Sequence, residues 1–211
     1  MDKTKAQEKF LKILELLNGC REKLFATYNL FVANLEQTKQ VKAELGEKYE
    51  KLLDLRHEYV QLTSSNKPVK TRIAKVRKDA KALKDEHDSQ VASVDTIMDD
   101  AKACRKTYKQ EVIMCCDTYK QLKTKFGTDA SIGQKDNKAN TDAINNEDEN
   151  ASKFASVDNG YKQQVKLVKR ILEKIDTVKV GYKTVKEELK EQAKMFLELF
   201  NKIYEGELVL N

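Results

Sequence analysis

The stretch FLKILELLNGCREKLFATYNLF, Phe10 to Phe31, places an apolar residue at every seventh position. The same series continues as far as Tyr59 with no change of spacing. A seven-residue apolar repeat of this length is typical of a helix that packs in a coiled coil. The series consists of Phe10, Leu17, Leu24, Phe31, Thr38, Leu45, Leu52 and Tyr59.

Two more series with the same period follow along the chain. Across the three series 22 of 24 positions are apolar, whereas a composition of 40% hydrophobic residues gives about 10 by chance. The sequence therefore predicts three long helices that share one buried seam. The second series is Ile73, Ala80, His87, Val94, Ala101, Tyr108, Cys115 and Leu122, and the third is Phe154, Tyr161, Val168, Ile175, Tyr182, Leu189, Phe196 and Ile203.

Polar segments separate the three series. The segment TSSNKP at 63–68 contains capping residues and the one proline. The segment 127–150 is polar and carries six acids against two bases. The predicted fold class is therefore all-α: a single domain over 1–211 that forms an elongated, antiparallel three-helix coiled-coil bundle and dimerises into a longer rod. We predict helices at about 5–62, 67–126 and 152–207, and a loop at 127–150.

The composition limits the class of protein. Seven Gly and one Pro in 211 residues, with 35% charged residues, are typical of long helices rather than a compact globule. No run of 18 apolar residues is present, so no segment is predicted to span a bilayer. The first residues, MDKTKAQEKF, lack the hydrophobic core of a signal peptide, so we expect a cytoplasmic protein with four reduced cysteines.

The sequence contains no motif of catalysis or phosphate binding. His87 occupies a seam position, which favours a tolerated polar core residue over a ligand. Cys104 and Cys115 are eleven residues apart, about 16 Å along one helix, and cannot share one zinc ion. We therefore expect no catalytic residue, no metal site and no cofactor, and we expect a protein that is not an enzyme.

Basic residues gather in two blocks that the predicted fold brings together. Residues 101–125 hold seven bases and two acids, and 161–186 hold eight bases and two acids. With a net charge of +6, this pairing favours an anionic partner, although a charged helix face can also be merely solvated. Nucleic acid is less favoured than membrane, because Tyr108 and Tyr161 lie on the seam rather than as stacking platforms. The heptad turns five lysines outward: Lys102, Lys106, Lys109, Lys120 and Lys123.

Wide apolar stripes occur in the first helix around residue 53 and in the third helix over 195–210. In the antiparallel register these stripes meet at one end of the bundle, and exposed apolar patches of this kind are typical of an interface. The alternative is a locally thicker core within one chain. The predicted homodimer contacts are Leu53, Leu55, Met195, Phe196, Leu197, Phe200 and Tyr204.

The chain length, the three antiparallel helices and the lysine-rich stretches beside the second connection resemble a BAR-superfamily domain over residues 8–208. The resemblance implies a dimer that lies on acidic membrane phospholipids at the cytoplasmic surface and senses or shapes curvature. The long acidic connection at 127–150 departs from that pattern. A structural coiled-coil or cytoskeletal scaffold that binds protein partners is the alternative. The lipid-binding residues that the resemblance implies are Lys102, Arg105, Lys106, Lys109, Lys120, Lys123, Lys125, Lys162, Lys166, Lys169 and Arg170.

Overall fold

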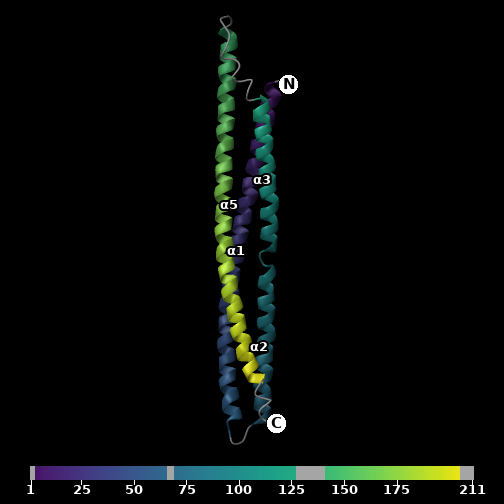
Figure 1. Ribbon diagram of the computed structural model, residues 1–211, viewed down its shortest axis with the longest axis vertical. Helices are drawn as coiled ribbons and strands as arrows, with labels where there is room; N and C mark the ends of the chain where they lie inside the picture. The colour runs from purple at the N-terminus through teal and green to yellow at the C-terminus, as the bar shows by residue number, and fades with distance from the viewer. Residues whose placement is uncertain (1–2, 66–68, 127–140, 205–211) are drawn as a thin grey trace. The chain divides into compact units, whose positions relative to one another are not determined.

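A computed structural model of the protein describes residues 3–65, 69–126 and 141–204. Within those ranges the regular elements are all helices and no strand is present (Figure 1). The predicted all-α three-helix class is confirmed, with α2 and α3 together in the place of the second predicted helix. The helices are α1 (Lys3–Thr63), α2 (Lys70–Thr96), α3 (Asp99–Phe126) and α5 (Thr141–Tyr204).

The last helix begins earlier than predicted. α5 starts at Thr141, so the predicted loop is wrong for residues 141–150, while 127–140 and the predicted helix end at 207 lie outside the described residues. The segment from Thr141 to Asn159 contains neither Gly nor Pro. Because adding a residue to an existing helix costs far less than starting one, a polar composition alone does not stop α5 from extending.

The second predicted helix is interrupted at Ile97 and Met98, which form a turn between α2 and α3. Before the turn the buried positions include His87 and Val94, which are seven residues apart. After it a new seven-residue register contains Met98, Val112 and Tyr119; it begins four residues after Val94 and three before the heptad position Ala101, which is also buried. Such a four-residue insertion is a stutter, and it rotates the buried stripe around α3.

The chain packs as two compact units, described here separately. Unit 1 comprises Met1–Leu30 and Ala101–Asp176, and unit 2 comprises Phe31–Asp100 and Thr177–Asn211. A single domain over 1–211 stays a prediction. In each unit α1 and α5 run parallel, and the segment from the second predicted helix runs antiparallel to both.

The core of unit 1 is aromatic. Phe10 meets the Tyr119 ring edge-on at 5.2 Å, and Tyr119 stacks on Tyr161 with centroids 3.6 Å apart. Ile13 completes this buried cluster. Aromatic pairs add about 0.5–1.5 kcal/mol beyond the area that they bury, so these contacts hold α1, α3 and α5 together.

The core of unit 2 contains the one buried histidine. His87 is 3% exposed and stacks on Phe196 at 3.9 Å, which confirms its prediction as a polar core residue. Desolvation lowers the pKa of His87, so the ring is neutral at neutral pH. The buried cluster to which Phe196 belongs also includes Leu52, Tyr59 and Ile203. All eight positions of the first heptad series, from Phe10 to Tyr59, are buried as predicted.

The predicted dimer contacts mostly belong to this core. Phe196 is 1% exposed within its own chain, so its assignment to a dimer interface is wrong. Leu53, Leu55, Phe200 and Tyr204 are partly buried against the same cluster, which favours the thicker intrachain core. Only Met195 and Leu197, of the seven, leave close to half of the side chain exposed, at 52% and 45%.

Candidate functional site

In unit 1, α3 and α5 contact each other along one line of residues, and we call the surface along this line the basic groove. Arg105 on α3 binds both carboxylate oxygens of Asp176 on α5, at 2.7 and 2.9 Å. Further along, Lys123 on α3 lies 2.7 Å from Asp158 on α5. These two carboxylate bridges mark two levels of the groove. The lysines along it are Lys102, Lys106, Lys109, Lys120, Lys123, Lys162 and Lys169.

Lys109 reaches the groove because of its place on α3. It lies one turn after Arg105 and seven residues before Cys116, and both of these side chains contact α5. Residues four or seven apart share one face of a helix, so Lys109 also faces α5.

Lys169 occupies the matching place on α5. It lies seven residues after Lys162, which shares Asp158 with Lys123, and seven before Asp176, which binds Arg105. Lys109 and Lys169 therefore lie on the same groove between its two carboxylate bridges. Both are exposed, and neither makes an ion pair with any side chain that the structure describes.

Asp158 is the most constrained acid of the groove. Its carboxylate accepts hydrogen bonds from Lys123 at 2.7 Å and from the Tyr119 hydroxyl at 2.9 Å, and it pairs with Lys162 at 2.7 Å. The hydrogen bonds from Lys123 and Lys162 hold the pKa of Asp158 well below its usual range. Burial, with the Asp158 carboxylate beside it, raises the pKa of the Tyr119 hydroxyl, which stays protonated as a donor.

Arg105 is wrongly placed among the lipid-binding residues. The shifted register of α3 puts it on the buried stripe, seven residues from both Met98 and Val112. Its side chain is 20% exposed, its guanidinium is held by Asp176, and its Nε is buried without a hydrogen-bond partner among the described residues. This arginine closes the bundle and is not free to bind a ligand.

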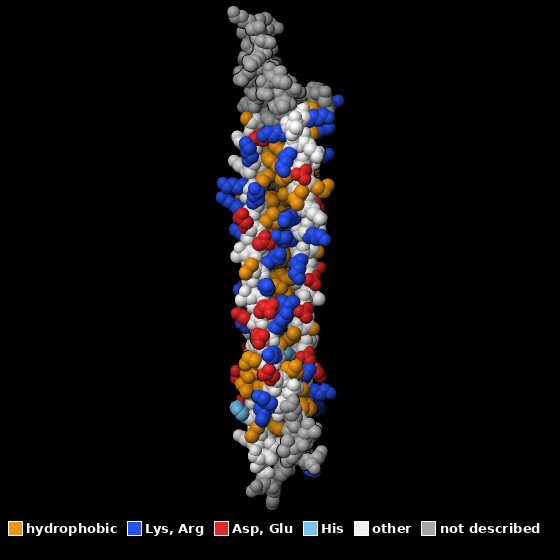
Figure 2. Space-filling view, in the orientation of Figure 1, with side chains coloured by type: hydrophobic (Ala, Val, Ile, Leu, Met, Phe, Trp, Pro, Cys, Tyr) orange, Lys and Arg blue, Asp and Glu red, His pale blue; other side chains and the backbone are white. Residues whose placement is uncertain are grey.

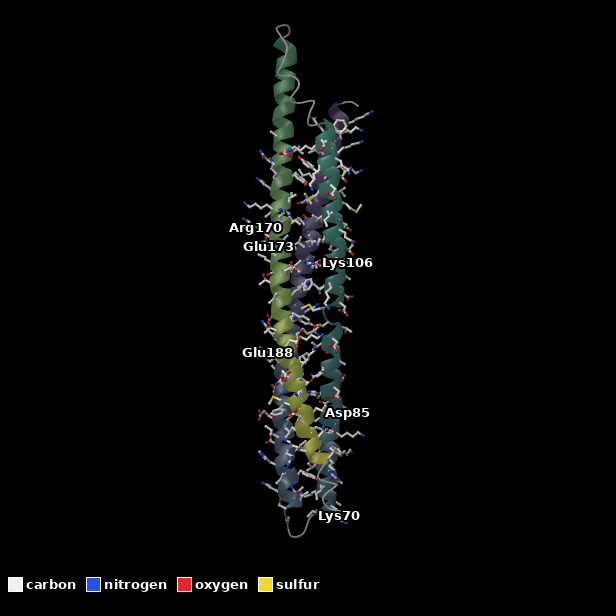
Figure 3. The ribbon with its side chains drawn as sticks, viewed as in Figure 1. Lys70, Asp85, Lys106, Arg170, Glu173 and Glu188 are labelled. Atoms are coloured by element: carbon white, nitrogen blue, oxygen red, sulfur yellow. The ribbon has the colours of Figure 1, made fainter. Side chains whose placement is uncertain are left out.

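The predicted lipid-binding residues do not form one face. Figure 3 shows Lys106 on α3 and Arg170 on α5 pointing away from one another. Arg170 lies one turn before Lys174, whose ammonium is 5.8 Å from the Tyr28 ring centre on α1, so Arg170 belongs to the α1 side of α5. Lys125 lies over the Phe126 ring at 5.9 Å. Arg170, Lys125 and Lys166 lie outside the basic groove.

The two units differ in the balance of basic and acidic residues. Over residues 5–30, 101–126 and 155–176, unit 1 has 17 Lys and Arg against 8 Asp and Glu. Over 31–65, 69–100 and 177–204, unit 2 has 18 against 17. On the face drawn in Figure 2, Lys and Arg side chains lie over both α3 and α5, with hydrophobic side chains between them. The positive charge of these parts of the chain is therefore concentrated in unit 1.

The cysteines offer no metal centre. Cys20 is buried on α1, its thiol donates to Glu111 on α3 at 3.6 Å, and Cys115 lies beside it. Burial raises the pKa of the Cys20 thiol to about 12 and also raises that of Cys115, so both are neutral thiols. In the part of the chain that the structure describes, no group of three His, Cys, Asp or Glu could hold a metal ion.

Sequence analysis did not find Asp158 and Asp176 as parts of the site. Counting charges by block hid them, because each is a single acid within a basic stretch. The spacing of Asp176 from two lysines could have identified it as part of the site. Asp176 follows Lys169 by seven residues and Lys162 by fourteen, which places one acid on the same face as two lysines.

Comparisons with known proteins leave the function open. No protein-family model matches the chain, and no curated protein matches it. A solved structure of a computationally designed three-helix bundle is similar, with 14% identity, a TM-score of 0.41 and 96% of each chain covered. Among the described residues, no helix has both the length and the apolar character needed to cross a bilayer.

Proposed function

We propose that the protein is a non-enzymatic, peripheral membrane-binding protein whose basic groove binds acidic phospholipid surfaces. The observation that carries the proposal is the pair Lys109 and Lys169, which face one groove between two carboxylate bridges and have no acid of their own. Two like charges held on neighbouring helices repel each other in the isolated protein. An anionic surface relieves that repulsion.

Lysine is the residue type that suits such a surface. Its ammonium acts as a point charge on a flexible stem and follows phosphate groups that have no fixed geometry. Each lysine near an acidic leaflet contributes about 1 kcal/mol. Lys106, Lys109 and Lys169, which are exposed and make no ion pair with a described residue, would together supply about 3 kcal/mol, and salt would screen it. A location at the cytoplasmic face of a membrane, dimeric assembly and an effect on curvature belong to the same proposal and rest on the BAR resemblance.

Vesicle sedimentation over a salt series tests the proposal. The protein is mixed with phosphatidylcholine vesicles that contain or lack phosphatidylserine. We expect binding to the acidic vesicles alone, and it should weaken as salt rises because the attraction is electrostatic. Absence of binding to acidic vesicles at low salt overturns the proposal. Equal binding to duplex DNA and to vesicles would instead indicate a general polyanion surface.

A pair of charge-matched variants tests the groove itself. K109E/K169E removes two groove lysines, and we expect vesicle affinity to fall by at least about thirtyfold, since two lost lysines alone are worth about 2 kcal/mol. K183E/K190E changes two exposed lysines of unit 2 and alters the net charge by the same amount. We expect the control to keep most of its affinity. Equal losses in the two variants would assign binding to net charge rather than to the groove.

The second candidate function is a structural scaffold that binds protein partners. The exposed Met195 and Leu197 on unit 2 favour it, because apolar side chains left open on α5 are suited to another protein surface. The variant M195S/L197S separates the candidates. It should leave vesicle binding unchanged if the basic groove is the membrane site, and a large loss of vesicle binding would move the site to unit 2.

A further inference from the structure

A second groove of unit 1 lies between α1 and α5, where apolar contacts accompany a hydrogen bond from Arg21 to Gln164 at 3.1 Å. Leu14 on α1 lies against Gly160 on α5, where an added Cβ would come within 3.3 Å of it, and Lys174 lies over the Tyr28 ring. These contacts join residues that are 146 apart in both cases, so α1 and α5 run parallel at a constant offset. We call this the apolar groove.

Three large apolar side chains stand exposed along the apolar groove. Leu11 is 48% exposed and lies one turn before Leu14, and Phe25 is 52% exposed with its ring 6.1 Å from that of Tyr28. Leu167 is 38% exposed and lies seven residues from both Gly160 and Lys174, which places it on the same side of α5. Exposed apolar residues that follow one groove mark an interaction surface rather than scattered exposure.

The rims of the apolar groove carry an exposed acid on α1 and exposed bases on α5. Glu22 on α1 lies three residues before Phe25, its side chain is 66% exposed, and it pairs at 3.8 Å with Arg21, which is 29% exposed. On α5, Lys166 and Arg170 flank Leu167, are exposed and make no ion pair with a described side chain. With the offset of 146, Glu22 lies at the level of residue 168, midway between Lys166 and Arg170. The groove is therefore complementary to itself when α1 of one copy faces α5 of another.

We propose that two copies of this chain associate in parallel through the apolar groove. In a parallel two-fold arrangement α1 faces the second copy's α5, so each Glu22 meets the second copy's Lys166 and Arg170 at its own level. In an antiparallel arrangement α1 faces α1 and α5 faces α5, which sets acid against acid and base against base. Charge complementarity therefore selects the parallel dimer. This proposal does not depend on membrane binding.

The area of the groove sets the strength of the dimer. From Leu11 to Tyr28 the groove is about 26 Å long, and two helices side by side are about 20 Å wide. The footprint is then about 500 Å² on each copy, or roughly 1,000 Å² in total, which is the low end for a specific interface. We expect a reversible dimer with a dissociation constant in the micromolar range.

Sedimentation equilibrium of the full chain, from low to high micromolar concentration, tests the proposal. We expect a monomer–dimer equilibrium that F25S/L167S weakens at least about tenfold, since it removes two exposed apolar side chains from each copy. V180S removes an exposed apolar side chain from α5 in unit 2, where Val180 is 68% exposed, and should change nothing. A monomer at every concentration, or a dimer that F25S/L167S leaves intact, overturns the proposal.

Charge exchange tests the parallel arrangement. E22K alone and K166E/R170E alone should each weaken the dimer several-fold, because each sets like charges against one another. The combined variant E22K/K166E/R170E restores opposite charges across the interface and should return the dissociation constant close to its original value. If E22K leaves the dissociation constant unchanged, α1 faces α1, where like charges meet before and after the substitution, and the proposed parallel arrangement is wrong. Circular dichroism checks that each exposed substitution leaves the helices formed.

Discussion

Asp158→Asn is the sharpest probe of unit 1, because this one side chain joins α3 and α5 and also neutralises part of the basic groove. Asp158 is 13% exposed and is held by Lys123, Lys162 and the Tyr119 hydroxyl. The substitution keeps the shape of the side chain and removes its charge. It should lower the stability of unit 1 and strengthen vesicle binding at the same time.

The magnitude follows from the three partners of Asp158. The amide oxygen of Asn still accepts the Tyr119 hydrogen bond, so that contribution is mostly retained. The two lysines are 47% and 65% exposed, and pairs of that kind contribute about 0.2–1 kcal/mol each. We therefore expect a loss of about 1 kcal/mol in the free energy of unfolding. The groove gains one net positive charge, which corresponds to about fivefold tighter binding to acidic vesicles.

The pH dependence of the unfolding free energy supplies a second test of Asp158. The folded-state pKa is depressed, so the stabilisation is fully present above the pKa of an unfolded aspartate, about 3.9, and is lost as the pH falls through the folded pKa. Urea unfolding followed by circular dichroism at pH 7 and in the acid range should show a shallower acid loss for Asp158→Asn. D95N, which breaks the pair between Asp95 and Lys186 in unit 2 and changes the net charge by the same amount, serves as the control for vesicle affinity, which it should leave unchanged. Equal stability of Asp158→Asn and the native chain at pH 7, together with unchanged vesicle affinity, would refute this account of the groove.

Two further predictions concern unit 2. Phe196→Ala should cost about 3–5 kcal/mol of unfolding free energy, because a fully buried ring leaves a cavity, and thermal unfolding should show this while vesicle binding at a permissive temperature persists. His87→Leu should remove an acid sensitivity. The folded pKa of His87 is lowered by desolvation despite Asp88 at 3.1 Å, so the unfolded chain binds the proton first and the native protein loses stability as the pH falls below about 6.5. Urea unfolding at pH 7 and pH 5 measures that loss, and an equal loss in His87→Leu would show that another group causes it.

The fold was predictable from the sequence where one periodicity runs without interruption. On α1 every position of the series from Phe10 to Tyr59 is buried, including the polar Thr38, which satisfies its hydroxyl on the Asn34 carbonyl at 2.8 Å. The bundle class follows from such a stripe, because three stripes of equal length bury one another. Helix ends were less predictable. α5 extends back to Thr141 through residues with no apolar pattern, since propagation needs only the absence of a breaking residue.

The basic groove was predictable only in part, because its geometry depends on a feature that no local pattern reveals. The outward direction predicted for Lys109 was wrong, because it assumed an uninterrupted heptad, whereas the positive charge of α3 and α5 was clear from the sequence. The partners of the charges were not. Whether an acid such as Asp176 neutralises a lysine or anchors a partly buried arginine depends on the register between two helices, which is set by packing and not by composition.

The turn at Ile97 and Met98 links these outcomes. A continuous heptad from α2 would place Tyr108 and Cys115 at the centre of the seam and Arg105 on its flank. The stutter moves the centre to Met98, Val112 and Tyr119. In this register Arg105 lies on the buried stripe, where its guanidinium binds the carboxylate of Asp176. Lys109 then faces α5 instead of the outer surface. One four-residue insertion thus removes a base from the surface and brings another into the groove, so the register of α3 and not its charge alone selects the lysines that are available to an anionic ligand.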